Sequence, residues 1–81
     1  MFPQFKPAGD SALVIIFGDT INESINRKVH AVVRAIEKAN PEWLIEAVPT
    51  YTSVYLYYDP IKISYSKVIE ALRPFLLAEP K

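Results

Sequence analysis

The 81-residue sequence contains no cysteine, so it can form neither a disulfide bond nor a thiolate metal site. A chain without cysteine suits a reducing compartment, and we expect a cytoplasmic protein. Glycine is also scarce: the two present, Gly9 and Gly18, lie in neither a glycine-rich phosphate loop nor a dinucleotide-binding fingerprint. The sequence therefore predicts no nucleotide site and no cofactor.

An excess of charge of either sign is absent as well. Nine Lys and Arg balance nine Asp and Glu, which removes the overall electrostatic attraction that nucleic acids and anionic membranes exert on their partners. No apolar run reaches membrane-spanning length, and Met1 to Pro7 lacks the apolar core of a signal peptide. We expect neither a nucleic acid nor a membrane as the partner.

The length predicts a single domain, residues 1–81. A domain of this size buries only roughly 60% of the surface that its unfolded chain exposes. We therefore expect its margin of stability to be small.

The most informative segment runs from Ser53 to Asp59. Val54, Leu56 and Tyr58 alternate with Tyr55 and Tyr57, so a strand here would be apolar on both faces. A strand with one face in water alternates apolar with polar residues, whereas a strand covered on both faces does not. The pattern predicts a sheet that needs a covering layer on each side.

The first half of the chain contains signals for two strands and a helix. A possible edge strand at Phe2 to Lys6 precedes a turn at Pro7 to Asp10. The continuous apolar run Leu13 to Phe17 predicts a central strand buried on both sides. Thr20 and Glu23 have the spacing of a capping box, which predicts that a helix begins there, and Asn40-Pro41 would end it.

The second half predicts a hairpin and a shorter helix. Leu44 to Val48 is separated from the strand at Ser53 by so short a link that the two segments should form an antiparallel hairpin or one bent strand pair. Ser64 is the expected N-cap of the second helix, and Pro74 should end its regular hydrogen bonding early.

The predicted order is (β)βαββα, an α+β two-layer sandwich with both helices on one face of a mainly antiparallel sheet of three to four strands. Nothing in 81 residues is left to cover the other face. Tyr55 and Tyr57 are the candidate interaction residues there, with Tyr51 if the register continues that far. A partner chain, a second copy or a further part of the protein could cover them; alternatively, the amphipathic tyrosines simply tolerate water.

Catalytic signals are few. The single histidine, His30, has no second His or Cys with metal-ligand spacing and is expected at the protein surface. The serines lie at turns and caps rather than in a nucleophile elbow. Asp10, next to Gly9, is expected to hold the turn by accepting backbone amide hydrogen bonds.

Several short motifs follow one another along the chain: Pro7 to Leu13, Phe17-Gly18, Ile21, Asn26, Val29, His30, Val48 to Ser53 and Tyr58 to Pro60. In this order and spacing they resemble the N-terminal domain of the 5-oxoprolinase B-subunit family. This family also contains the sporulation kinase A inhibitor and proteins labelled allophanate hydrolase subunit 1.

The resemblance implies a non-catalytic first domain that works in an ATP-dependent 5-oxoprolinase complex. Such a complex converts 5-oxoproline, ATP and water into L-glutamate, ADP and phosphate. In one branch it implies instead a module that blocks the autophosphorylation of a sensor histidine kinase. Members of the family carry a following cyclophilin-like domain, which these 81 residues do not include. No catalytic residue carries over from the resemblance, and Gly9 and Asp10 are the matched pair to test first.

Overall fold

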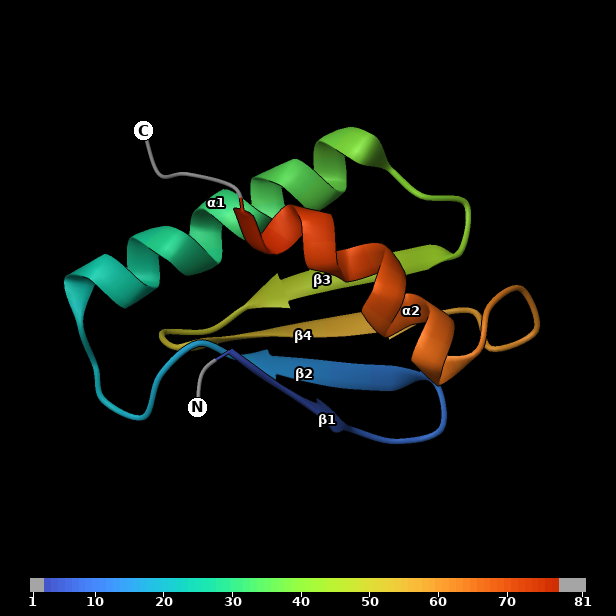
Figure 1. Cartoon of the computed structure of the whole chain (residues 1–81), viewed down its shortest axis with the longest axis horizontal. Coiled ribbons are helices and arrows are strands. Elements are labelled where there is room, and N and C mark those ends of the chain that lie inside the picture. The colour runs from blue at the N-terminus through green and yellow to red at the C-terminus, as the bar shows by residue number, and fades with distance from the viewer. Residues whose placement is uncertain (1–2, 78–81) are drawn as a thin grey trace.

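The computed structural model describes residues 3–77, which form a two-layer α+β fold (Figure 1). Its four strands make one antiparallel sheet in the order β1-β2-β4-β3. The two helices lie together on one face of that sheet. The elements are β1 (Gln4–Pro7), β2 (Ala12–Ile16), α1 (Glu23–Ala39), β3 (Leu44–Pro49), β4 (Ser53–Tyr58), α2 (Tyr65–Leu72) and the 3-10 helix η1 (Arg73–Leu77).

This architecture confirms the predicted fold class and element order, including the edge strand at the start. That strand begins at Gln4; Phe2, where the sequence would begin it, lies outside the described residues. The hairpin of β3 and β4 is also confirmed. None of the helices within residues 3–77 is long and apolar enough to cross a membrane.

The start of α1 differs from the prediction. Asn22, not Thr20, caps the helix: its backbone is extended, and its side-chain oxygen accepts hydrogen bonds from the amides of Ser24 at 2.8 Å and Ile25 at 3.4 Å. Glu23 is then the first helical residue rather than the third, so it cannot complete a capping box. The predicted stop is confirmed, since Asn40 adopts the left-handed conformation that ends helices.

The second helix ends where its proline predicts. Ser64 caps α2 by accepting a hydrogen bond from the amide of Lys67. Regular helix continues only to Leu72, and the chain passes through Pro74 as the tighter η1. Proline has no amide hydrogen and its ring clashes with the preceding turn.

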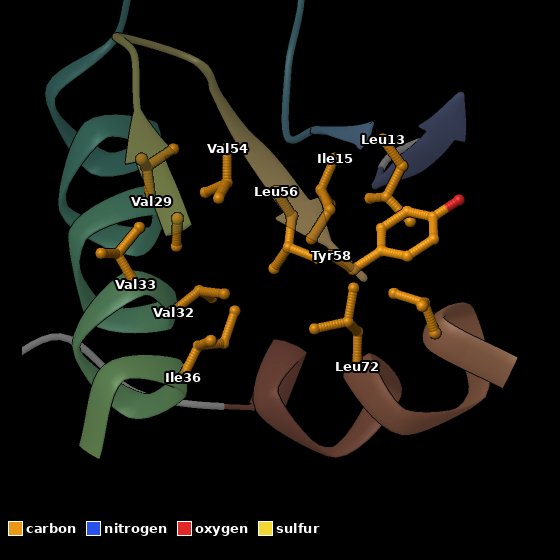
Figure 2. Packing of buried hydrophobic residues seen from close by; sticks show 12 residues of the cluster. Leu13, Ile15, Val29, Val32, Val33, Ile36, Val54, Leu56, Tyr58 and Leu72 are labelled. Carbon is orange, nitrogen blue, oxygen red and sulfur yellow. The ribbon is translucent and has the colours of Figure 1, made fainter. Parts of the chain in front are cut away.

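The core lies between the sheet and the two helices (Figure 2). Leu13, Ile15 and Leu56 point from the sheet toward the helices and are fully buried. The helices contribute fully buried aliphatic side chains, Val29, Val32 and Ile36 of α1 and Val68 and Leu72 of α2. The helices therefore pack against one face of the sheet.

Candidate functional site

The face of the sheet that points away from the helices is the candidate site, which we call the open face. Antiparallel register places directly paired residues on the same side of a sheet. Three rows cross the open face, each made of such pairs. They are Lys6–Val14–Tyr55–Val48, Ala12–Tyr57–Glu46 and Gln4–Ile16–Ser53.

The centre of the open face is apolar and aromatic. Tyr55 and Tyr57 are 38% and 39% exposed, and both helices pack on the other face of the sheet. Beside them, Val14 and Ala12 of the central strand are only 8% and 4% exposed, because the side chains of both neighbouring strands flank them. The open face is therefore a contiguous apolar surface rather than a set of isolated exposed residues.

Opposite charges mark its two edges. Lys6 lies on edge strand β1 and Glu46 on edge strand β3, and both are exposed. Neither forms an ion pair within residues 3–77. An apolar, aromatic centre with a polar rim is the usual composition of a protein–protein interface.

Two further exposed apolar residues lie near this face. Ile45 is 66% exposed and occupies the irregularity in β3 between Leu44 and Glu46. Tyr51 is 62% exposed, but it lies in the β3–β4 connection, beyond the paired residues Pro49 and Ser53. The register that would extend the face to Tyr51 therefore stops before it.

The turn between β1 and β2 contains Gly9 and Asp10. The amide of Ala8 donates a 2.9 Å hydrogen bond to the carbonyl of Ala12, which closes the turn. Gly9 has φ of 119°, in a region that is essentially restricted to glycine. Asp10 is exposed, and its carboxylate takes part in none of the side-chain hydrogen bonds found among the described residues. The expectation that Asp10 holds the turn through such bonds is wrong; the main chain and Gly9 hold it.

This assignment predicts unequal effects of two neighbouring substitutions. Gly9→Ala should lower the free energy of unfolding by about 1 to 3 kcal/mol, because alanine is strained at this φ. Open space surrounds the position where its Cβ would lie, so the loss would come from the backbone alone. Asp10→Asn should change the free energy of unfolding by less than about 0.5 kcal/mol. Urea denaturation of both variants measures this difference, and equal losses would contradict the assignment.

No group of three or more His, Asp or Glu side chains in the described part of the chain could hold a metal ion. His30 is exposed, as predicted. Every buried side-chain nitrogen or oxygen in residues 3–77 has a hydrogen-bond partner.

The sequence interpretation missed part of the open face. Val14 lies at its centre and Val48 beside Tyr55, yet neither was singled out. The signal for Val14 was present, because a central strand predicted to be buried on both sides must place alternate residues on the second face. Val48 gave no comparable signal, because the irregularity in β3 between Leu44 and Glu46 decides on which face of the sheet Val48 lies.

The fold and the open face define a class: a small α+β domain in which residues 3–77 cover only one side of the sheet. Residues 3–81 match the family model described as "Carboxyltransferase domain, subdomain C and D". The chain belongs to this family.

Three relatives illustrate the relationship. The B-subunit of 5-oxoprolinase from Bacillus subtilis (strain 168) is 40% identical over 60 residues, which are 74% of this chain and 25% of that protein. The crystal structure of a conserved uncharacterized protein of Pyrococcus horikoshii is 52% identical, with a TM-score of 0.83 over 90% of this chain and 34% of the other. The N-terminal domain of the histidine kinase inhibitor KipI from Bacillus subtilis is 35% identical, with a TM-score of 0.62 over 93% of this chain and 69% of the other.

These comparisons confirm the family resemblance drawn from the sequence. They also show that the chain spans a quarter to a third of the length of the first two relatives. Most of each of those proteins therefore lies outside the domain described above.

Proposed function

We propose that this chain acts as the non-catalytic first domain of a protein of the 5-oxoprolinase B-subunit type. In that role it would support a complex that converts 5-oxoproline, ATP and water into L-glutamate, ADP and phosphate. The 40% identity to a 5-oxoprolinase B-subunit supports this assignment. The observation that carries the non-catalytic role is the open face, where Val14, Tyr55 and Tyr57 lie on the side of the sheet that the helices of residues 3–77 do not cover.

We propose one occupant for the open face: the portion of the protein that follows this domain in the longer relatives. The Pyrococcus horikoshii protein has about two thirds of its length outside the match. A strand that is apolar on both faces needs cover on both faces, and the helices already cover one. The domain itself needs no cofactor for this role.

A chimera tests the proposed function. The 60 matched residues of the Bacillus subtilis B-subunit would be replaced by the corresponding part of this chain, and the product would be purified with the other subunits of that enzyme. We expect the chimera to assemble and to hydrolyse ATP in response to 5-oxoproline at a rate within about tenfold of the parent, because the transplanted residues supply no catalytic group.

Two controls sharpen this experiment. Asp10→Asn in the chimera should leave turnover largely unchanged, whereas a loss of about a hundredfold or more, the size expected for a missing acid or base, would show that the domain contributes to catalysis. A B-subunit with the domain deleted should fail to assemble. Full activity of the deleted form would contradict the proposal.

A second candidate function is inhibition of a sensor histidine kinase. The similarity to the N-terminal domain of KipI, over 93% of this chain, favours it. The same chimera distinguishes the two functions, because a kinase inhibitor would slow autophosphorylation of a sporulation-type sensor kinase and would not support lactam-dependent ATP hydrolysis.

A further inference from the structure

A groove lies on the helix side of the sheet, on the opposite side from the open face. Its volume is about 490 Å³. Helix α1 packs over β3, β4 and η1 rather than over the edge strand β1, which leaves the space between β1 and η1 incompletely filled. Side chains from separate elements line it: Pro3 and Phe5 near β1, Phe17 after β2, and Leu76 and Leu77 of η1.

Two basic side chains lie beside the apolar residues of the groove. Arg73 and Lys28 line the groove, and none of its described lining residues is acidic. The guanidinium carbon of Arg73 lies 5.7 Å from the centroid of the Phe5 ring, a distance at which the ring attracts and orients a cation. No carboxylate in residues 3–77 forms an ion pair with Arg73.

We propose that this groove binds a small hydrophobic carboxylic acid, with its apolar body against Phe5, Phe17 and Leu76 and its carboxylate at Arg73. The volume falls within the range of roughly 300 to 1,000 Å³ that small-molecule sites occupy, and such sites combine mostly apolar walls with a few polar groups. The planar guanidinium matches both oxygens of a carboxylate. This site is independent of the proposed function, since it lies on the other side of the sheet.

Nuclear magnetic resonance titration with 4-phenylbutyrate tests the site, with 4-phenylbutanamide as the neutral probe of the same shape. We expect the acid to bind about tenfold more tightly than the amide, because only the acid forms a charge-assisted pair with Arg73. Shifts in resonances should occur at Phe5, Phe17 and Leu76. Resonances of Tyr55 and Tyr57 on the open face should not move.

Variants of exposed residues distinguish the contribution of charge to binding from that of the apolar lining. Arg73→Gln should remove the preference for the acid, whereas Arg34→Gln, which removes an exposed cation of α1 outside the groove, should preserve it. Leu77→Ser should weaken the binding of both the acid and the amide. Because Leu77 is 77% exposed, the variant should keep the fold of the parent chain. Equal affinity for acid and amide, an unchanged preference in Arg73→Gln, or shifts confined to other surfaces would each overturn the proposal.

Discussion

Leu56→Ala is expected to reduce the free energy of unfolding by about 2 to 5 kcal/mol, since the leucine is fully buried and its loss leaves a cavity in the core. This is a large part of the roughly 5 to 15 kcal/mol that stabilises a typical domain. Tyr57→Ser on the same strand should cost only about 1 kcal/mol or less, because Tyr57 faces away from the helices and loses mainly cross-strand contacts.

Chemical denaturation of both variants measures the contrast. If Leu56→Ala is too unstable to purify, Ile15→Val, another fully buried site, should cost about 0.5 to 1.5 kcal/mol and provides a milder probe. A loss at Tyr57 as large as the loss at Leu56 would mean that the open face is already packed within the isolated chain.

The second large effect is expected in binding. The double variant Tyr55→Ser/Tyr57→Ser should weaken association with the remaining portion of the Pyrococcus horikoshii relative by about thirtyfold or more. Loss of buried tyrosines at the centre of an interface commonly costs about 2 kcal/mol or more, which corresponds to that factor. Isothermal titration calorimetry, with the relative's remaining portion expressed separately, measures it.

A matched control is available in the loop between β4 and α2. Ile61 is 94% exposed and lies outside the sheet, so Ile61→Ser should leave the affinity unchanged. If the double tyrosine variant and Ile61→Ser bind the relative's remaining portion with equal affinity, the open face is not part of the interface.

Much of the fold follows from local signals in the sequence. The alternation from Val54 to Tyr58 placed each side chain of β4 on its observed face, and Pro74 ended α2 where proline geometry requires. The cap of α1 was mispredicted because Thr20 and Asn22 are both good N-cap residues. Sequence spacing favoured Thr20, whereas the chain is extended at Asn22 and places its oxygen at the first amides.

The candidate sites were predictable to different degrees. Tyr55 and Tyr57 could be placed on the open face because strand periodicity is local. The groove could not be predicted, since Phe5 and Arg73 come from opposite ends of the chain and meet only through packing. Gly18 shows the same limit. It is buried, and a Cβ at this position would collide with the side chain of Ile25. Close approaches of this kind leave no periodic pattern in a sequence.

The central claim is the proposal that the open face is covered by the portion that follows this domain in the longer relatives. Solvent paramagnetic relaxation measured on the ring protons of Tyr55 and Tyr57, before and after saturation with the remaining portion of the Pyrococcus horikoshii relative, tests this claim most directly. We predict that relaxation of both rings falls sharply in the complex while that of the Ile61 methyl groups stays the same. Rings that remain as accessible in the saturated complex as in the free chain would contradict the account.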